Sequence, residues 1–290
     1  MIFSAVKIFP FLRMVDSYPV IGKLLPMIIP KHLSEQRDAH RAYTKCVVMK
    51  RINNTEQNGR GDFMDSMLKH RGEKDGLTDE ELQTNSEVLV VAGSETTATL
   101  LAGVTYLLLQ TPHAMQKVTT EVRQAFDSEE QIDFVNATAK LPYMLACLDE
   151  ALRMYPPVPT GLQRITQNPS TEISGVRIPA GYQVSVHQSA AYRSSRNFHQ
   201  PMTFAPERWL PDAPVQFAND NRETFQPFSV GPRNCIGRNL AYNEMRLILA
   251  RVLWNFDLEL CEESNEWYKQ KAYLLWEKPP LMCKLKQRES

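Results

Sequence analysis

The chain has 290 residues, which is enough for one large domain with a substantial hydrophobic core. Lysine and arginine together number 33, as do aspartate and glutamate, so the formal net charge is zero. The sequence has no basic arm and no nucleic-acid-binding motif, so we expect no nucleic-acid partner. The five cysteines are odd in number and lack Cys-x-x-Cys spacing, which argues against a disulfide framework or a zinc site.

The N-terminal quarter of the chain is mildly basic. Residues 1–75 hold 13 Lys/Arg against 8 Asp/Glu, a net charge of +5. Residues 1–30 are apolar, but charged residues and prolines interrupt them too often for a membrane span. They fit either a contact with a membrane surface or a solvated face. Residues 88–109 are long enough to span a membrane, but Glu95 would be costly in lipid, so we expect a buried core helix there.

The pattern along the chain predicts a mainly α protein with a small mixed β-sheet. Thr78 and Glu81 form a capping box that opens a helix of about 30 residues. Turn residues such as Ser174-Gly175 punctuate β-rich runs. The elements expected are helical residues 33–71, the long helix 78–110, helices over 112–126 and 142–154, strands within 163–186, a helix over 238–256 and a terminal hairpin within 257–286.

One loop carries the strongest functional signal. Residues 228–237 read Phe-Ser-Val-Gly-Pro-Arg-Asn-Cys-Ile-Gly, with Cys235 between Gly231 and Gly237. A thiolate can ligate iron or act as a nucleophile, and the N-terminus of the following helix would stabilise it. The glycines allow a flat partner to approach the backbone, and Arg233 offers a fixed fork for a carboxylate. The alternative is that Cys235 is a small buried hydrophobe.

The long predicted helix contains Ala92-Gly93-Ser94-Glu95-Thr96-Thr97. A mid-helix glycine costs about 1 kcal/mol relative to alanine, so Gly93 points to a close approach at that position. Helical threonines can hydrogen-bond back to the preceding turn and bend the helix. An acid beside an alcohol on such a helix makes a short proton relay. The alternative is a polar patch that faces a neighbouring helix.

Two further signals lie downstream. Glu150 and Arg153 are spaced i, i+3 and therefore share a helix face. A Pro-Glu-Arg segment that ends in Arg208 follows later in the chain. Arg164 ends the proline-rich run 156–164 and is either a surface arginine or a ligand-binding one.

These motifs, in this order, resemble the cytochrome P450 family of haem-thiolate monooxygenases. The family's Phe-x-x-Gly-x-Arg-x-Cys-x-Gly pattern is filled at Phe228, Gly231, Arg233, Cys235 and Gly237. The resemblance covers about residues 30–286 and implies a cytochrome P450 fold that lacks its N-terminal part. It implies one haem-binding domain over residues 1–290, composed of roof helices and linker at 1–75, the oxygen-binding helix at 78–110, the Glu-x-x-Arg helix at 142–154, strands at 163–186 and the cysteine loop at 228–237.

The same resemblance implies roles for single residues. Haem is the cofactor, and Cys235 is the axial thiolate ligand of its iron. Phe228, Gly231, Arg233 and Gly237 shape the cofactor-binding loop, and Arg164 contacts a haem propionate. Ala92 and Gly93 leave room for dioxygen, while Glu95 and Thr96 deliver protons to it. Glu150, Arg153 and Arg208 form a buried network that supports the haem loop without taking part in catalysis.

The implied function is insertion of one oxygen atom of O2 into a small apolar organic substrate, with electrons from NADPH-cytochrome P450 reductase. The sequence as a whole resembles filamentous-fungal enzymes of secondary metabolism, which suggests a terpenoid or polyketide substrate. A thiolate-haem isomerase or dehydratase acting on peroxides is one alternative, although such enzymes typically lack the acid–threonine pair.

A truncated, non-catalytic remnant is the other alternative, because complete family members are considerably longer. A full-length form is expected at the cytoplasmic face of the endoplasmic reticulum membrane. This chain lacks an anchor, so we expect it in the cytoplasm, with residues 1–30 as a peripheral membrane contact.

Overall fold

The computed structural model describes residues 31–53, 61–73, 76–167 and 169–288. Residues 1–30, to which the sequence assigned a roof segment and a membrane contact, lie outside this range. The chain divides into two compact units, one ending at Glu95 and the other beginning at Thr96. The boundary falls inside a single long helix.

The first unit contains helices α5 (Lys31–Asn53) and α6 (Phe63–Leu68) and the first half of α7 (Asp79–Leu109). Asp62 caps α6, because its carboxylate accepts a hydrogen bond from the Asp65 amide at 2.9 Å. Arg51 of α5 pairs with Asp65 at 2.5 Å and so ties these two helices together. Helix α6 falls within the predicted helical stretch 33–71, and α5 begins two residues before it.

The predicted capping box at the start of α7 is confirmed. The Glu81 carboxylate accepts hydrogen bonds from the Thr78 amide and from the Thr78 hydroxyl, each at 2.8 Å. These bonds lower the pKa of Glu81 below its ordinary value. The Thr78 hydroxyl oxygen in turn accepts a hydrogen bond from the Glu81 amide at 3.3 Å. The helix ends at Leu109, one residue before the predicted end.

Helix α7 is long and apolar enough, by length and composition alone, to cross a membrane. Its second half is nevertheless a core element, since Leu100, Val104 and Leu108 are fully buried among protein side chains. Val88 and Val90 in the first half are 61% and 46% exposed. The expectation of a buried helix over residues 88–109 is therefore right for its second half and wrong for its first turns.

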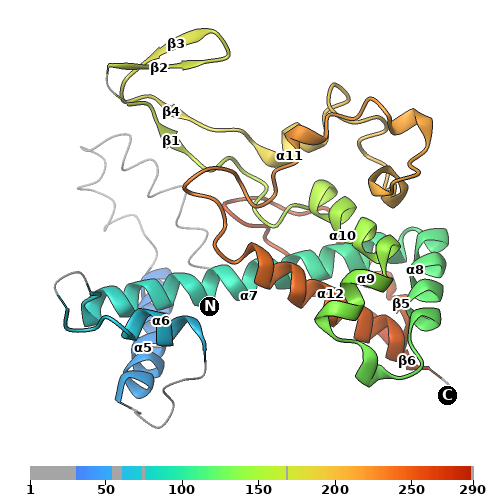
Figure 1. Ribbon diagram of the computed structural model, residues 1–290, viewed down its shortest axis with the longest axis horizontal. Helices are drawn as coiled ribbons and strands as arrows, with labels where there is room; N and C mark the ends of the chain where they lie inside the picture. The colour runs from blue at the N-terminus through green and yellow to red at the C-terminus, as the bar shows by residue number, and fades with distance from the viewer. Residues whose placement is uncertain (1–30, 54–60, 74–75, 168, 289–290) are drawn as a thin grey trace. The chain divides into compact units, whose positions relative to one another are not determined.

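The second unit is built mainly from helices that pack around this core. Helices α8 (Pro112–Ala125) and α12 (Arg238–Asn255) pack on each other, and α10 (Pro142–Met154) contacts both (Figure 1). The α-helices beyond α7 are α8 (Pro112–Ala125), α9 (Phe134–Lys140), α10 (Pro142–Met154), α11 (Gln188–Tyr192) and α12 (Arg238–Asn255). The 3-10 helices are η2 (Glu129–Gln131), η3 (Pro206–Trp209), η4 (Val215–Phe217), η5 (Arg222–Thr224) and η6 (Glu262–Ser264).

The described strands form three separate two-stranded antiparallel sheets. The pairs are β1 (Arg164–Ile165) with β4 (Gln183–Val184), β2 (Ser170–Ile173) with β3 (Val176–Pro179), and β5 (Phe256–Leu260) with β6 (Cys283–Gln287). The expected strands within 163–186 and the terminal hairpin are both present. A single mixed sheet is not present among the described strands, because β2 pairs only with β3, β1 only with β4 and β5 only with β6, all antiparallel. Ser174 and Gly175 both have positive φ (49° and 78°), as a tight two-residue hairpin requires.

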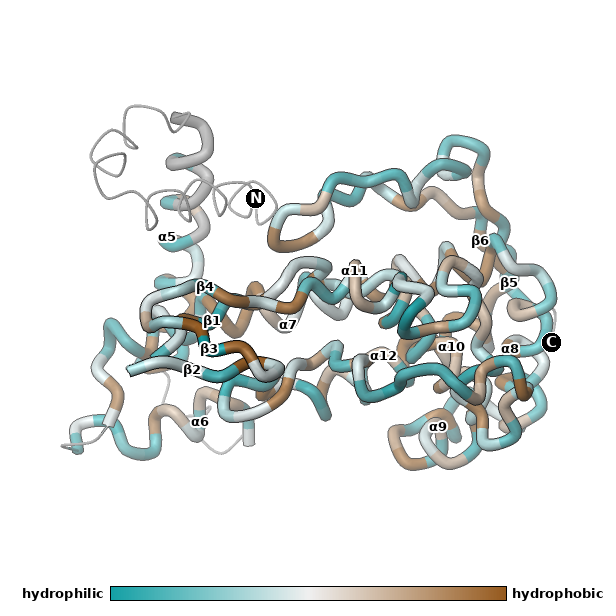
Figure 2. The backbone as a smooth tube through the Cα atoms, turned by 90° about the horizontal axis from the view of Figure 1, so that it is seen from above, coloured by the Kyte–Doolittle hydropathy of each residue, from teal (hydrophilic) through white to brown (hydrophobic). Residues whose placement is uncertain are grey.

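Apolar side chains around β1 to β4 lie at the surface. Ile165, Val176 and Val186 are 58%, 59% and 73% exposed. Brown hydrophobic stretches are visible near β1 and β3 in Figure 2. A two-stranded ladder is marginal on its own in water, so these sheets depend on neighbouring structure for their stability.

Candidate functional site

The cysteine loop is a closed turn that leads into α12. The Cys235 amide donates to the Phe228 carbonyl at 2.9 Å, and the Asn234 amide donates to the Gly231 carbonyl at 3.0 Å. Gly231 has a φ of 79°, a left-handed conformation that side chains other than glycine rarely adopt. The backbone of the loop itself therefore requires this glycine.

Gly237 has a different role. It is the N-cap of α12, with no side-chain cap and an ordinary φ of −86°. A Cβ added there would lie 3.9 Å from Cys235 Sγ, which is ordinary van der Waals contact. No described protein atom lies closer to that Cβ position, so the glycine keeps space open beside the sulfur.

The Cys235 side chain lies at the surface, which rules out the alternative of a buried hydrophobe. It is flanked by apolar side chains that are themselves uncovered: Val230 is 62% exposed and Ile236 is 80% exposed. The buried cysteine of the described chain is Cys147. An exposed thiol among exposed apolar side chains, at an uncapped helix N-terminus, fits a flat apolar group that binds an anionic sulfur.

Metal chemistry at Cys235 would need ligands from outside the protein. Among the described residues, no three His, Cys, Asp or Glu side chains are grouped to hold a metal ion. An iron bound by Cys235 would therefore have to arrive with its other ligands, as it does in haem.

Two arginines were predicted to bind a haem propionate or a similar carboxylate. Arg233 lies in the cysteine loop and is exposed. Arg164 is exposed on β1, where its guanidinium donates to the Gln163 carbonyl at 3.0 Å. Within the described chain, neither arginine forms an ion pair with a carboxylate, and the structure does not bring the two into contact. Both guanidinium groups remain accessible to an anionic ligand.

Residues behind the loop connect it to α10. The Phe228 ring packs on the Tyr242 ring of α12 with centroids 5.0 Å apart. The Tyr242 hydroxyl donates to Asp149 of α10 at 3.3 Å. Burial raises the pKa of Asp149 to about 6, although Tyr242, Arg246 and Arg238 partly offset this effect. Tyr242 and Asp149 were not predicted from the sequence. The available signals were the place of Tyr242, one turn into the helix after the loop, and the place of Asp149, directly before Glu150.

Behind this layer, the predicted network of Glu150, Arg153 and Arg208 is present and fully buried. Arg153 binds Glu150 through two hydrogen bonds of 2.9 and 2.8 Å. The Arg208 Nε atom lies 3.1 Å from the same carboxylate. All three side chains are at most 1% exposed. Such a bidentate pair supplies both charge compensation and fixed geometry.

The network is larger than the sequence predicted. Trp209 Nε1 and the Ala205 amide also donate to the Glu150 carboxylate, at 2.9 and 3.0 Å. Arg208 binds Asp220 at 2.5 Å. The Glu150 carboxylate thus accepts hydrogen bonds from donors on α10 and on the segment of η3. Asp220 supplies a second negative charge, so that two carboxylates balance the two buried arginines. Asp220 could not be found by spacing, because it lies in an irregular segment with no motif.

The acid–alcohol segment lies on α7 at the boundary of the two units. Ala92 and Gly93 are exposed, Glu95 and Thr96 are half-buried, and Ser94 donates to the Val90 carbonyl at 2.7 Å. This last bond is a back-bond of a helical hydroxyl to the preceding turn, made here by a serine, whereas the sequence analysis named only threonines. Within its own unit, a Cβ added at Gly93 would meet no described atom within 4 Å. Glu95 ends the first unit, whereas Thr96 and Cys235 belong to the second. The proton-delivering roles of Glu95 and Thr96 stay a prediction.

A second glycine of α7 explains how its buried half packs. A Cβ at Gly103 would lie 2.4 Å from Cδ1 of Tyr155. The Tyr155 ring in turn stacks on Trp276 with centroids 4.9 Å apart. Gly103 therefore lets the core helix lie directly against an aromatic cluster. The sequence analysis gave Gly103 no role, although its position inside an apolar helix was the available signal.

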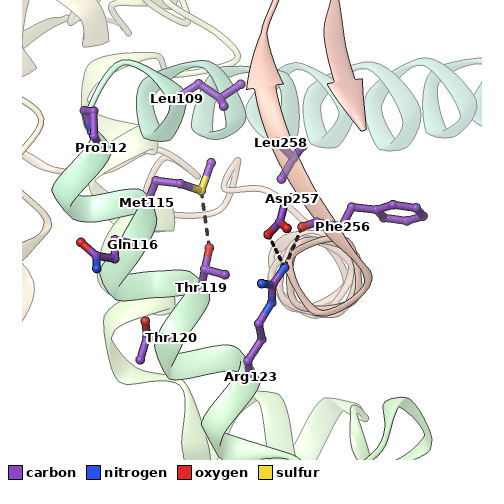
Figure 3. A pocket seen from close by; sticks show the side chains of 10 residues that line it. All are labelled: Leu109, Pro112, Met115, Gln116, Thr119, Thr120, Arg123, Phe256, Asp257 and Leu258. Carbon is purple, nitrogen blue, oxygen red and sulfur yellow. Dashed lines mark hydrogen bonds and ion pairs between the residues drawn. The ribbon is translucent and has the colours of Figure 1, made fainter. Parts of the chain in front are cut away.

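A groove of about 470 Å³ lies elsewhere in the second unit, between α8 and the start of β5. Figure 3 shows Arg123 on one side, donating to Asp257 at 2.8 Å and to the Phe256 carbonyl at 3.1 Å. None of the residues predicted for the haem site lines this groove. It is a surface feature separate from the cysteine loop.

Comparison with known proteins identifies the family. The family model described as "Cytochrome P450" matches residues 1–285. The chain belongs to the cytochrome P450 family, as the motifs implied.

Individual relatives are similar over nearly the whole chain. It is 55% identical to a trichothecene C-4 hydroxylase of Trichoderma arundinaceum over 99% of its own length and 58% of the relative. It is 54% identical to the cytochrome P450 monooxygenase olcB of Penicillium canescens, over 98% of this chain and again 58% of the relative. An averantin hydroxylase of Dothistroma septosporum is 44% identical, over 98% of this chain and 54% of that protein. The chain thus spans somewhat more than half the length of these relatives.

Proposed function

We propose that this chain is the haem-binding part of a monooxygenase that inserts one oxygen atom of O2 into a small apolar substrate of fungal secondary metabolism. The observation that carries the proposal is the exposed Cys235 thiol at the uncapped N-terminus of α12, inside a fully matched cysteine loop. The hydroxylase and monooxygenase names of the relatives support the reaction class.

The cofactor proposed is haem, and the described residues fit it. Haem held by a cysteine thiolate supplies dioxygen activation, since the thiolate donates electron density that favours O–O cleavage. Cys235 would hold the haem iron through its thiolate. Val230 and Ile236 offer apolar contact for a macrocycle, and the Arg233 and Arg164 guanidinium groups are accessible to propionates.

The protein's own contribution is to fix the sulfur and to handle protons. The hydrogen bond from the Cys235 amide to the Phe228 carbonyl sets the loop, and the amides at the start of α12 stabilise negative charge. Ala92 and Gly93 are proposed to leave space for O2. The Thr96 hydroxyl and the Glu95 carboxylate are proposed to donate protons to the distal oxygen, a role typically worth about 10²–10⁴ in rate.

Electrons would come from NADPH-cytochrome P450 reductase, and the full-length protein would work at the cytoplasmic face of the endoplasmic reticulum membrane. We propose a terpenoid or polyketide as the substrate class. The role of residues 1–30 at a membrane surface and the single haem domain over residues 1–290 remain part of this proposal.

The test is spectroscopic and uses the purified full chain reconstituted with haem. A red-shifted Soret band of the carbonyl-bound, thiolate-ligated haem is expected. A chain that stays free of haem under these conditions would contradict the proposal and favour a non-catalytic remnant. A thiolate-type spectrum accompanied by peroxide rearrangement without reductase would favour the isomerase or dehydratase alternative.

A further inference from the structure

Lys278 lies in a C-terminal segment whose backbone is anchored on both sides. The indole N–H of Trp276 donates to the Pro156 carbonyl at 2.7 Å. The indole N–H of Trp267 donates to the Pro279 carbonyl at 2.8 Å. These two hydrogen bonds from tryptophan indoles hold the backbone on either side of Lys278. The Lys278 side chain therefore extends from a fixed backbone position.

The Lys278 ammonium donates to the Thr99 hydroxyl oxygen of α7 at 2.9 Å. Thr99 is fully buried, and Lys278 is half-buried. Holding a lysine in such a place costs side-chain entropy and hydration of the ammonium. A hydrogen bond from a charged donor is also among the stronger contacts a hydroxyl can make. This contact joins a segment 179 residues away to the middle of α7.

Thr99 lies three residues after Thr96, so the two share a face of α7. While the Thr99 oxygen accepts from Lys278, its own proton is still available. In a helix, the acceptor within reach of that proton is a carbonyl of the preceding turn, which is the turn of Thr96. Thr99 is thus a point on α7, three residues after Thr96, at which the C-terminal segment contacts the helix.

We propose that Lys278 is a positioning residue for the monooxygenase reaction, and that its ammonium holds Thr99 and fixes the turn of α7 that carries Thr96. The inference rests on the proposed function. When the turn loosens, the Thr96 hydroxyl no longer lies where it can protonate the distal oxygen. Two electrons and two protons then leave with O2 as hydrogen peroxide, and the substrate is not oxygenated.

The test compares four variants in the full chain. Lys278→Met keeps the aliphatic stem and removes the ammonium, while Lys278→Arg keeps a charged donor. Thr99→Val keeps the volume and removes the hydroxyl, and it is combined with Lys278→Met in a double variant. Lys284→Met is the matched control, because Lys284 is an exposed lysine of β6 whose partner is Glu259 at 2.9 Å.

Two readouts are used, one of which needs no cofactor. Amide hydrogen exchange over residues 96–109 reports how firmly the turn is held. Lys278→Met and Thr99→Val should each speed exchange around Thr96 by about ten-fold, the size expected for one hydrogen bond to a charged group. The double variant should add nothing further, Lys278→Arg should restore part of the protection, and Lys284→Met should match the wild type.

The second readout is the share of electrons released as hydrogen peroxide by haem-loaded protein with reductase and NADPH. The same two single variants should raise that share, which a purely structural role would leave unchanged. Faster exchange with an unchanged peroxide share would overturn the positioning role, as would additive effects in the double variant. A wild type without a thiolate-type spectrum would instead contradict the proposed function itself.

Discussion

Arg208 and Glu150 are 58 residues apart in the chain, yet their side chains meet at 3.1 Å in a position where neither is more than 1% exposed. Both charges are acceptable there because the buried network to which they belong, with Arg153 and Asp220, compensates them. Breaking such a buried pair leaves an uncompensated charge, which costs about 3–5 kcal/mol.

Substituting Glu150 by Gln should therefore lower the free energy of unfolding by about 3–5 kcal/mol, since two buried arginines lose a shared carboxylate. The yield of haem-loaded protein should fall before any rate constant changes. Urea unfolding and haem content check this, with Glu259→Gln at an exposed ion pair as the control. Normal haem content combined with a selectively slowed chemical step would assign Glu150 a catalytic role instead.

The two glycines of α7 should respond in opposite directions to the same substitution. Gly103→Ala places a Cβ 2.4 Å from the Tyr155 ring and should destabilise the second unit by about 1–3 kcal/mol through overpacking. Gly93→Ala meets no described atom within its own unit and should stabilise the helix by about 1 kcal/mol. Thermal or urea unfolding of both variants measures whether their effects on stability have opposite signs. Equal effects would mean that Tyr155 does not pack on α7 as described.

Asp149 should make the protein less stable as the pH rises. Its pKa is raised from 3.8 to about 6, first by burial and then by the nearby Glu150 charge, so the folded state binds this proton more tightly than the unfolded chain. The stabilisation is complete below about pH 4 and is lost as the pH rises through about 6. The free energy of unfolding of Asp149→Asn should thus exceed that of the wild type by about 1–3 kcal/mol at pH 7.

The stability difference between Asp149→Asn and the wild type should shrink toward pH 4. Unfolding free energies measured from pH 4 to pH 7 give this difference directly, and effects of other titrating groups cancel in it. A difference that does not vary with pH would show that Asp149 is not desolvated in solution.

Thr96→Ala should separate the monooxygenase from a peroxide-rearranging enzyme. Cleavage of O2 requires protons at the distal oxygen, whereas rearrangement of a preformed peroxide does not. The variant should keep haem and substrate binding but release hydrogen peroxide in place of product, with a loss of about 10²–10⁴ in the coupled rate. Thr97→Ala, next to it on α7, is the matched control. Fully coupled turnover in Thr96→Ala would remove the proton-relay role.

Most of the helical framework could be predicted from local signals. The Thr78–Glu81 capping box and the prolines at 112 and 142 mark helix starts that the structure places at the same points. Residues that act through long-range packing could not be predicted in this way. Asp220 and Lys278 carry no local pattern, and they become visible only when the fold brings them to Arg208 and Thr99.

The motifs of the site could be predicted from the sequence, but the exposure of its side chains could not. The filled pattern around Cys235 marked the loop, while the exposure of the thiol and of Ile236 came from the structure. The two glycines of that loop looked equivalent in the sequence. Gly231 is required by a left-handed φ of 79°, whereas Gly237 keeps space beside the sulfur.

The most direct test of the account is the carbonyl-bound absorption spectrum of reduced, haem-reconstituted Cys235→Ala. Cys261→Ala and Cys283→Ala, at half-buried cysteines of the terminal hairpin region, are the matched controls. Both controls should keep the thiolate-type spectrum of the wild type, and Cys235→Ala should lose it. A thiolate-type spectrum in Cys235→Ala would contradict the assignment of Cys235 as the iron ligand.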